Sequence, residues 1–548
     1  MHSVPSLFST TSKGVEYSIH PNRRVSLGLV TAWLAILAAF ALPSTAIAEK
    51  YDKVYRVASH NSYETKYARR LVDVVGKTTS IEIDIYDNTY ISSNTNTFIP
   101  FLDQQLPLVR KGGKPRYWYV RHDIKGDNDN NCARPSEGLK GCLQDLASWS
   151  GNHRNHEVIT LFLDKKQGWG WNDSRAPADL DRLITDVIPR NKIFTPADLK
   201  GSHGSLRLAA QKGRWPDMSA LRGKFIFVLT GGTLFNHNKT HHEYARDRKG
   251  NAILFVAPDI DETSDVRGTP NQFDSGTDDW VVFCNMKRDK ASFPLTAAIA
   301  NQGYITRVWG GDGKTATDNR TELELMQSFR VHFSAFYKYH LPKTSAQVIA
   351  YEDDNGWDGH GDRWYVDKGS YSYKGRGGYS KLDPVTNDEV RAVFVPKGLK
   401  VYMTDDDSFQ PGRRGAITIE GPARKNIHNG HGLAGKVSSI RVQDVDAAPP
   451  KRITVYENDY GWKGGGKRWR VTKGSYSHKG RGGNAKLPFP NDEIRAVDVP
   501  AGVTVYMTDK DSFKTGGRGV VTIKGPARTN IDHRKKGLAG KVSSIRVR

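Results

Sequence analysis

The chain has 548 residues, a formal net charge of +22 and 37% hydrophobic residues. This length is too great for a single hydrophobic core and predicts three or four domains. The three cysteines form neither a CxxC pair nor a His/Cys cluster, which argues against zinc, and no nucleic-acid-binding motif accompanies the positive charge.

Residues 1–48 have the pattern of a signal peptide. Arg23-Arg24 precede an apolar run from Val25 to Leu42, and Ala46-Ile47-Ala48 has the small-x-small pattern of a signal peptidase site. The apolar run is also long enough to be a membrane anchor, but the break at Pro43 favours cleavage near Ala48. We therefore expect a secreted, extracellular protein.

Export would place the cysteines in an oxidising compartment, where disulfides persist. Cys132 and Cys142 are ten residues apart and are the natural partners, which leaves Cys284 over. We expect one disulfide.

Residues 49–345 alternate between β-rich and helix-like segments. Strands alternating with helices predict a parallel α/β domain, and nearly 300 residues is the size of a TIM-like β/α barrel. The expected strands are 54–57, 80–86, 116–120, 158–163, 224–229 and 280–283. The expected helices are 139–150, 178–187 and 322–339.

Ionisable residues recur at the ends of these strands. Glu82 and Asp84 alternate within one strand and so share a face. The ends of barrel strands converge on one mouth, and buried acids there require a cation. An oxygen ligand set suits Ca2+, and Mg2+ less well. The expected ligands are Asn61, Glu82, Asp84 and Asp164, and the histidines left for proton transfer are His60 and His122.

These motifs resemble the secreted, Ca2+-dependent branch of the phosphatidylinositol-specific phospholipase C superfamily. The segments that carry the resemblance are Ala58–Tyr63, Ile81–Asp84, Val120–His122, Asn131-Cys132 with Cys142-Leu143, Ile159–Lys166 and Leu221–Val228. The resemblance implies His60 and His122 as the catalytic pair. It also implies attack of an inositol 2-hydroxyl on phosphorus, with Glu82 or one imidazole as the base; base and acid stay unassigned.

Two further features bear on the substrate. The strand ending at Leu229 leads into Thr230-Gly-Gly232 without the lysines of phosphoinositide-hydrolysing relatives, which favours phosphatidylinositol or a glycosylated form. Lys165 and Lys166 are candidates for a phosphate contact, although lysines after a strand are common.

The C-terminal part is a tandem duplication. Residues 346–443 and 452–548, joined by a linker at 444–451, share long identical segments such as Gly432–Val442 and Gly537–Val547. Short alternating strands between Gly, Asn and Asp turns indicate two all-β sandwiches, and Tyr351–Trp357 and Tyr456–Trp462 resemble the opening of a βγ-crystallin Greek key.

That resemblance implies possible Ca2+ sites, but the family motif is broken in each half of both copies. At most one site per copy is left, and the residues that would form these sites are Asp388 with Ser438 and Asp492 with Ser543. We expect a structural or surface-binding role more than Ca2+ binding.

The two copies differ in charge. Residues 347–446 hold 14 Lys/Arg against 15 Asp/Glu, a net −1, whereas residues 451–548 hold 22 against 8, a net +14. This divergence predicts that the second copy binds an anionic surface or glycan, or that it serves only solubility.

The sequence as a whole predicts a monomeric, secreted, metal-dependent phospholipase C that acts at a phospholipid membrane surface and binds no nucleic acid. Two alternatives are a glycerophosphodiester-type phosphodiesterase on the same barrel and a catalytically idle surface-binding protein. The first family usually has Arg after its first His, where this chain has Asn61. An idle site would have no reason to keep the histidines and acids together.

Overall fold

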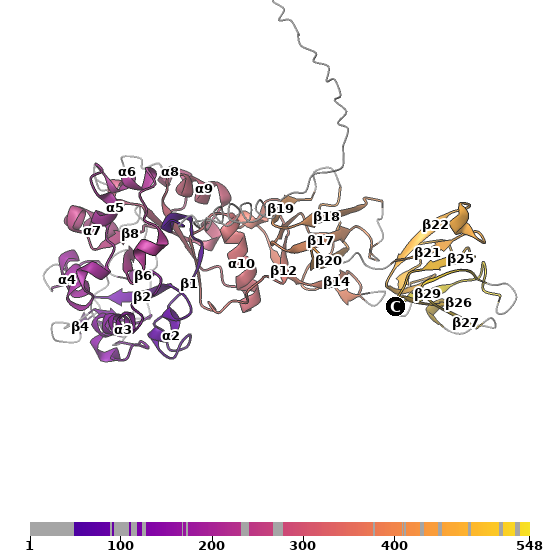
Figure 1. Cartoon of the computed structure of the whole chain (residues 1–548), viewed down its shortest axis with the longest axis horizontal. Helices are drawn as coiled ribbons and strands as arrows, with labels where there is room; N and C mark the ends of the chain where they lie inside the picture. Colours follow the sequence, from indigo (N-terminus) through magenta and orange to yellow (C-terminus); the bar gives the residue numbers. More distant parts are fainter. Residues whose placement is uncertain are drawn as a thin grey trace, which may run out of the picture. The chain divides into compact units, whose positions relative to one another are not determined.

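Figure 1 shows the computed structural model of the chain. The expected signal peptide at residues 1–48 lies outside the residues that the structure describes. The described residues are 49–87, 90–91, 109–110, 118–122, 128–166, 168–170, 174–231, 240–266, 278–375, 379–407, 409, 413–427, 432–447, 452–480, 484–513, 519–531 and 537–548.

Eight parallel strands within the described residues form a β/α barrel. One sheet has the order β1-β11-β10-β9, and the other has the order β2-β6-β7-β8 with β5 antiparallel at its edge. Bridges such as Asp259–Asn285 join β8 to β9, and the Ser62 amide donates to the Glu82 carbonyl (3.1 Å) where β1 meets β2. The strands are β1 (Arg56–Ser59), β2 (Ser80–Tyr86), β5 (Tyr119–Val120), β6 (Ile159–Lys165), β7 (Phe225–Thr230), β8 (Leu254–Val256), β9 (Phe283–Lys287), β10 (Ile305–Trp309) and β11 (Phe333–Phe336).

Helices surround these strands (Figure 1). They are α2 (Leu71–Val75), α3 (Leu139–Asn152), α4 (Pro177–Val187), α5 (Pro196–Lys200), α6 (Leu206–Gln211), α7 (Thr240–Arg248), α8 (Thr263–Val266), α9 (Phe293–Asn301) and α10 (Ala316–Ser328). A short separate ribbon pairs β3 (Tyr90–Ile91) with β4 (Val109–Arg110).

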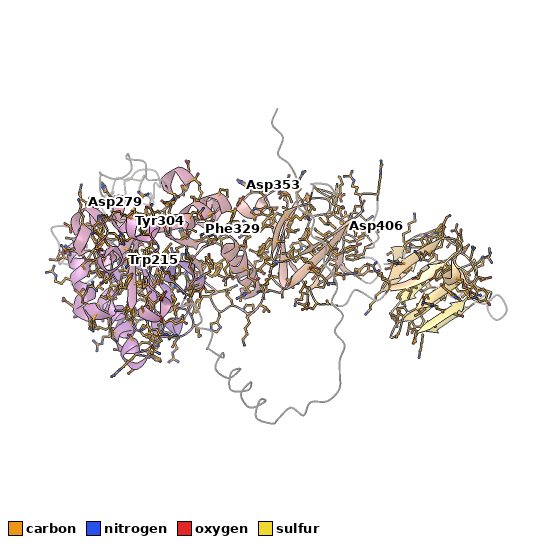
Figure 2. The ribbon with its side chains drawn as sticks, turned by 45° about the horizontal axis from the view of Figure 1, so that its top comes forward. Trp215, Asp279, Tyr304, Phe329, Asp353 and Asp406 are labelled. Atoms are coloured by element: carbon orange, nitrogen blue, oxygen red, sulfur yellow. A yellow bond between two sulfur atoms is a disulfide. The ribbon has the colours of Figure 1, made fainter. Side chains whose placement is uncertain are left out.

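Alternation along the strands separates the barrel interior from the helix layer. Leu161 and Leu163 of β6 pack in one core cluster with residues of α3 and α4, whereas Phe162 between them faces the other way and packs in a second cluster with residues of β7 to β11. Trp215, labelled in Figure 2, belongs to this second cluster, where its ring centroid lies 5.3 Å from that of Tyr51. The same alternation decides which polar side chains face inward at the strand ends.

The predicted multidomain fold is confirmed, with several errors among the predicted barrel elements. The predicted strand at 280–283 overlaps β9 only at Phe283, because Asp278–Trp280 form a 3-10 helix, and β8 and β10 were not predicted. Strand β2 has the predicted bounds, and α3 and α4 cover the first two predicted helices. The predicted helix at 322–339 is wrong, because α10 ends at Ser328 and residues Phe333–Phe336 form strand β11 between β1 and β10. This segment is buried at every position, so it suits a strand covered on both faces.

The C-terminal copies are two β-sandwiches with the same topology, each with its own core cluster. The first, module 1, has the sheets β13-β12-β16-β19 and β15-β14-β20-β17-β18; the second, module 2, has β22-β21-β25-β28 and β24-β23-β29-β26-β27. Module 1 has β12 (Gln347–Tyr351), β13 (Arg363–Asp367), β14 (Gly369–Ser372), β15 (Ser380–Lys381), β16 (Ala392–Val395), β17 (Leu399–Thr404), β18 (Ala416–Glu420), β19 (Ala423–Asn426) and β20 (Ser439–Asp444). Module 2 has β21 (Arg452–Tyr456), β22 (Arg468–Thr472), β23 (Gly474–Ser477), β24 (Ala485–Lys486), β25 (Ala496–Val499), β26 (Thr504–Thr508), β27 (Val520–Lys524), β28 (Ala527–Asn530) and β29 (Ser544–Val547).

Module 1 shares a core with the barrel. Ile349 and Phe394 belong to the same buried cluster as Phe329, which follows α10. At the same junction the buried carboxylate of Glu322 forms ion pairs with Arg288 and, at 3.3 Å, with Arg363 of module 1. Glu322 is buried, and Arg288 and Arg363 counter the effect of burial and lower its pKa.

No helix within the described residues is long and apolar enough to cross a membrane.

A buried histidine predicts how the stability of the barrel depends on pH. The Thr306 amide donates to Nδ1 of His332 (3.0 Å), and Nε2 donates to the Asp52 carbonyl (3.0 Å), so the ring is held neutral. Burial lowers the pKa of His332 to about 4. Because an unfolded histidine has a pKa of about 6.5, only the unfolded state binds the proton between these values. The contribution of the neutral His332 ring to the free energy of unfolding is therefore complete above pH 6.5. It is lost as the pH falls to 4.

We expect this loss to reach roughly 3 kcal/mol, measured as the free energy of urea unfolding between pH 7 and pH 4. The variant His332→Gln should be less stable at pH 7 and should show a flatter pH dependence than the wild type. The exposed His340→Gln is the control and should keep the wild-type slope. An unchanged slope in His332→Gln would contradict the assignment.

Candidate active site

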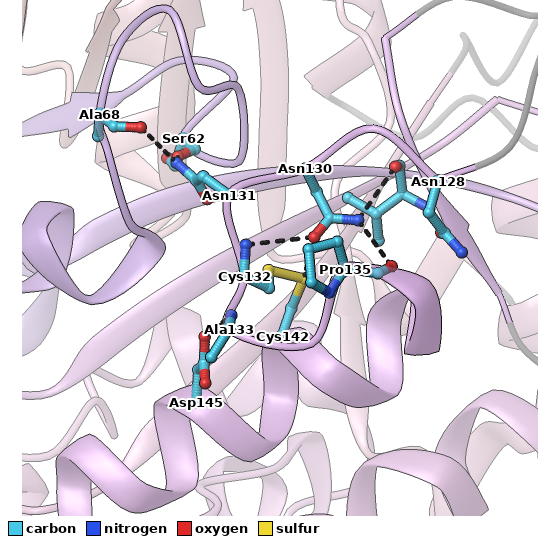
Figure 3. Close-up of a disulfide and its surroundings, with 11 residues drawn as sticks. Ser62, Ala68, Asn128, Asn130, Asn131, Cys132, Ala133, Pro135, Cys142 and Asp145 are labelled. Atoms are coloured by element: carbon cyan, nitrogen blue, oxygen red, sulfur yellow. Dashed lines mark hydrogen bonds between the residues drawn. A yellow bond between two sulfur atoms is a disulfide. The ribbon is translucent and has the colours of Figure 1, made fainter.

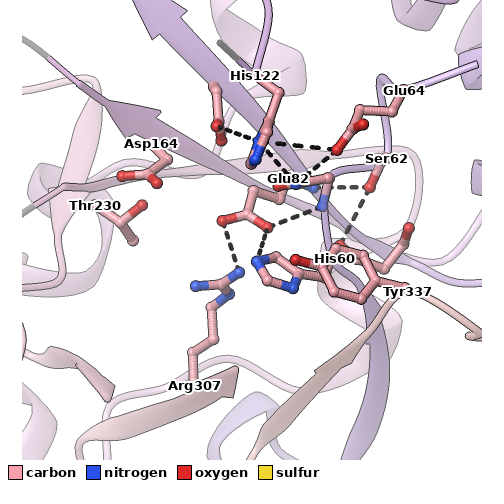
Figure 4. A network of polar contacts seen from close by, with 12 residues as sticks. His60, Ser62, Glu64, Glu82, His122, Asp164, Thr230, Arg307 and Tyr337 are labelled. Carbon is pink, nitrogen blue, oxygen red and sulfur yellow. Dashed lines mark hydrogen bonds and ion pairs between the residues drawn. The ribbon is translucent and has the colours of Figure 1, made fainter. Parts of the chain in front are cut away.

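The turn after β1 carries the first group of polar side chains. His60 and Asn61 are buried, and Asn61 has a left-handed backbone (φ 48°), a conformation that Asn tolerates better than most residues. The Asn61 amide donates to Oε2 of Glu82 (3.0 Å), and its side-chain amide donates to Oε1 of Glu64 (2.7 Å) and lies 3.1 Å from Nδ1 of His122. Asn61 therefore contacts one histidine and two carboxylates of the site, and Figure 4 shows these three partners, Glu64, Glu82 and His122.

Glu82 on β2 lies at the centre of this network. Arg307 of β10 contacts its Oε1 at 2.9 Å, and Nε2 of His60 lies 3.5 Å from its Oε2. Burial by itself would raise the pKa of Glu82, but Arg307 and His60, helped by Lys166 and the Asn61 amide, lower it to about 2. Glu82 is thus a permanent anion in the barrel interior.

Asp84, two residues further along β2, faces the same side. It is fully buried, and its Oδ1 has no hydrogen-bond partner within the described residues. Burial raises the pKa of Asp84 to about 6, with help from Asp164 and Glu82, and against the effect of Lys166, whose Nζ lies 3.1 Å from Oδ2. A buried oxygen without a partner is a position that a cation can satisfy.

Glu82, Asp84 and Asp164 form a three-carboxylate group. One oxygen of each lies within 4.8 Å of the others, because β2 and β6 pair in parallel with Asp84 opposite Asp164. Lys166 also forms an ion pair with Asp164, so its ammonium partly neutralises the group. The hard-oxygen donor set fits Ca2+ rather than zinc.

The two histidines have opposite electrostatic settings. His60 is buried, its ring stacks on that of Tyr337 (4.4 Å between centroids), and burial lowers its pKa. His122 is half-exposed, and the interaction with Asp84, whose Oδ2 lies 3.7 Å from Nδ1, together with the charge of Glu64, raises its pKa. Burial thus favours the neutral form of His60, whereas the neighbouring carboxylates favour the cationic form of His122, and general acid–base catalysis uses one group of each kind.

All six residues expected at the barrel mouth lie in this network, and the structure adds Arg307, Glu64 and Tyr337. Sequence reasoning missed Arg307 because strand β10 was not expected; the Ile305–Trp309 segment, with Arg307 among apolar residues, is the signal that was available. Glu64 and Tyr337 follow β1 and β11 without a distinctive motif.

The two lysines after Asp164 have different surroundings. Lys166 lies at the carboxylate group, whereas Lys165 is fully buried and points to the other side of β6, where Nζ contacts Asp87 (2.5 Å) and the ring of Trp169 (4.8 Å to the centroid). This placement argues against the predicted phosphate contact of Lys165, since consecutive strand residues face opposite sides. Lys165 is instead a structural cation of the helix layer.

The disulfide between Cys132 and Cys142 is present, as predicted, and Cys284 is a buried free cysteine. The neighbouring Asn131 donates its side-chain amide to the carbonyls of Ser62 and Ala68 (both 3.0 Å) (Figure 3). The disulfide segment therefore holds the turn that carries His60 and Asn61.

The two pairs of residues expected to form Ca2+ sites in the modules differ in whether they are hydrogen-bonded. Ser543 donates to Oδ1 of Asp492 at 3.4 Å, whereas no bond between the side chains of Asp388 and Ser438 is present in the described part of module 1. Buried oxygens without a hydrogen-bond partner in the described residues lie next to these aspartates, at Asn387 and Asn491.

The chain is similar to several known proteins. The family model of the Ca2+-dependent phosphoinositide phospholipases C matches residues 126–265. Among solved structures, a calcium-dependent phosphoinositol-specific phospholipase C from Pseudomonas sp. is 29% identical over 56% of this chain and 94% of its own (TM-score 0.46). A Ca2+-dependent phosphatidylinositol-specific phospholipase C from Streptomyces antibioticus is 21% identical over 53% and 96% (TM-score 0.43). The N-terminal domain of protein S is 26% identical over 18% and 94% (TM-score 0.13). No curated protein matches the chain.

The barrel brings two histidines and three carboxylates together, an arrangement suited to metal-dependent phosphodiester cleavage. Within the barrel, residues 126–265 are similar to the Ca2+-dependent phosphoinositide phospholipase C family, and two β-sandwich modules follow the barrel. The matched segment contains Asp164 and the disulfide. The two histidines, Asn61, Glu82 and Asp84 precede it, and Arg307 and Tyr337 follow it, so their roles rest on the geometry described above.

Removing the disulfide should loosen the catalytic turn. In Cys132→Ser/Cys142→Ser, loss of a short closed loop should lower the free energy of unfolding by about 2–3 kcal/mol. Proteolysis should then cut first near residues 61–70, as mapped by mass spectrometry. Cys284→Ser is the matched control. Wild-type resistance of the double variant would show that Asn131 holds the turn without the disulfide.

Arg307→Met should leave Glu82 as an unpaired buried anion and cost about 3–5 kcal/mol of stability, measured by urea unfolding. Arg307→Met/Glu82→Gln should regain much of this loss because the uncompensated charge is gone. Arg214→Met, which removes an exposed arginine of the same domain, is the control. An additive double variant would contradict the direct pairing of Arg307 with Glu82.

Proposed function

We propose that the protein is a secreted Ca2+-dependent phospholipase C that cleaves phosphatidylinositol into diacylglycerol and a cyclic inositol phosphate. The observation that carries this proposal is the geometry of the site, in which His60 lies 3.5 Å from Glu82 and His122 lies 3.7 Å from Asp84 of one three-carboxylate group. Phosphodiester cleavage with an internal nucleophile needs one base, one acid and a cation for the phosphoryl oxygens.

The residues that would hold the ion are Asn61, Glu82, Asp84 and Asp164. A bound Ca2+ would stabilise charge on the phosphoryl oxygens and make the attacking hydroxyl more acidic. The unpartnered Oδ1 of Asp84 supports this ligand set. Lys166, whose ammonium lies at two of these carboxylates, supplies a second positive charge for a phosphate.

His60, held neutral by burial, suits the role of the base that takes the proton of the inositol 2-hydroxyl. The hydroxyl oxygen forms a bond to phosphorus, and the bond from phosphorus to the glycerol oxygen breaks. His122, whose cationic form Asp84 and Glu64 favour, suits the role of the acid that protonates the departing oxygen. Glu82 is a poor base, because its pKa is held at about 2, and it instead stabilises the imidazolium that forms on His60.

Secretion is supported by the disulfide, since structural disulfides persist mainly outside the cytoplasm. The export pattern of residues 1–48 points to the same compartment.

The C-terminal modules are proposed to hold the enzyme at a surface. The net charges of −1 and +14 on two modules with one topology show that their surfaces diverged while their framework did not. A lipid substrate lies at a bilayer surface, which gives an attached basic module a role in recruitment.

The activity is tested by following water-soluble inositol phosphate released from phosphatidylinositol micelles in Ca2+. EDTA should stop release, and His60→Ala and His122→Ala should each reduce kcat by about 10²–10⁴-fold, the usual contribution of a general acid or base. His340→Ala should leave it unchanged.

Phosphorus NMR identifies the product, and a cyclic inositol phosphate is expected. Turnover of glycerophosphoinositol but not of the lipid would favour the glycerophosphodiester alternative. No turnover of either in Ca2+, or full activity in His60→Ala, would overturn the enzymatic proposal.

A further inference from the structure

Strand register makes the two modules comparable residue by residue. In module 1, one row across the sheet β13-β12-β16-β19 is Tyr365, Ile349, Phe394 and Arg424. The corresponding row in module 2, across β22-β21-β25-β28, is Arg470, Thr454, Asp498 and Arg528. The same face of one fold thus carries different chemistry in the two copies.

In module 1 this face is buried against the barrel. Ile349 and Phe394 are at most 1% exposed, and the guanidinium of Arg424 lies 4.1 Å from the ring centroid of Phe293 in α9. Beside the row, Arg363 pairs with Glu322, and Asp358 accepts a hydrogen bond from the Phe293 amide (2.9 Å).

Module 2 has lost the groups that make this contact. Thr454 replaces Ile349, Asp498 replaces Phe394, and Arg470 replaces Tyr365. Burying such a row without partners would be unfavourable. The face therefore does not suit a second barrel, and it lies open: Arg468, the counterpart of Arg363, is exposed and has no ion-pair partner among the described residues.

The open face is mainly cationic and carries one exposed aromatic ring. We define the basic face of module 2 as Lys463, Arg468, Arg470, Arg528 and Tyr460. Lys463 replaces Asp358, and Tyr460, 57% exposed, replaces Asn355. The carboxylates nearby are Asp498, which pairs with Arg528 (2.8 Å), Glu457, which lies 4.0 Å from Lys467, and Asp459.

We propose that the basic face of module 2 docks on the anionic headgroups of a phospholipid bilayer. Guanidinium groups suit bidentate contacts to phosphate, and an exposed tyrosine suits the interface between headgroups and acyl chains. The choice of a lipid rests on the proposed function, since the barrel is then an enzyme whose substrate lies in such a bilayer.

The test uses the full mature chain and vesicles that the barrel does not cleave. Co-sedimentation is measured with phosphatidylcholine vesicles, with and without phosphatidylserine, in EDTA. Each cation near an anionic surface contributes roughly fivefold to binding, so Lys463→Gln/Arg468→Gln/Arg470→Gln should weaken binding to the phosphatidylserine vesicles by about 100-fold. Tyr460→Ser should weaken binding to a smaller extent.

The matched control is Lys486→Gln/Lys524→Gln/Lys541→Gln, which removes the same charge from exposed positions of module 2 outside this face. It should lose much less affinity than the face variant. Equal loss in both variants would overturn the proposal in favour of net charge alone, and so would heparin binding without vesicle binding. Circular dichroism confirms that each variant folds.

A second assay distinguishes failure of vesicle docking from failure of the catalytic activity of the barrel. Hydrolysis of a soluble, short-chain phosphatidylinositol by the face variant should equal that of the wild type. Wild-type protein that hydrolyses this substrate but does not bind the phosphatidylserine vesicles would overturn the docking surface and leave the phospholipase. Vesicle binding without hydrolysis would overturn the phospholipase, and docking would then lose its link to a lipid substrate.

Discussion

The ion pair between Glu82 and Arg307 lies at the centre of the barrel and orders the site around it. Both side chains are buried, so neither charge is satisfied by water and each requires the other. Arg307 also donates to Asn285 of the neighbouring strand (2.7 Å), which fixes the guanidinium. With Glu82 held as an anion, the Asn61 amide and His60 gain a fixed acceptor, and the turn that carries them takes its position from β2.

The remaining carboxylates differ from Glu82 in how completely they are compensated. Asp84 and Asp164 share the ammonium of Lys166, and Oδ1 of Asp84 keeps no hydrogen-bond partner in the described structure. The uncompensated negative charge of the site is therefore concentrated at Asp84 and Asp164, beside His122. A divalent cation and a phosphate both find complementary groups there, and the histidine on this side is the one whose pKa is raised.

The duplicated modules show how one framework serves two environments. In module 1 the sheet face is part of a hydrophobic core shared with α9 and α10, and a buried cluster of Arg288, Glu322 and Arg363 lies at that junction. In module 2 the register is retained while the residues of the same face are polar. Since the internal core of a module and its outer face alternate along each strand, the face can change without disturbing the fold.

The sequence by itself determined much of this protein. Apolar segments with acids at alternate positions predicted β2 and the shared face of Glu82 and Asp84, and the near-identical segments of the two copies predicted the two sandwiches. The spacing of Cys132 and Cys142 predicted their disulfide. These features are local, and their physical signals lie in neighbouring residues.

Only the tertiary structure decided the rest. Strand β11 was mistaken for the end of a helix because its burial depends on β1 and β10, far away in the sequence. Arg307 belongs to the site because β10 lies across the barrel from β2, which brings its guanidinium to Glu82. Lys165, a predicted site residue, lies outside the site because its side chain faces the helices. The pKa values of His60 and His122 shift in opposite directions because different carboxylates, cations and rings surround each imidazole. Charge and burial act through space, so residue order alone does not specify them.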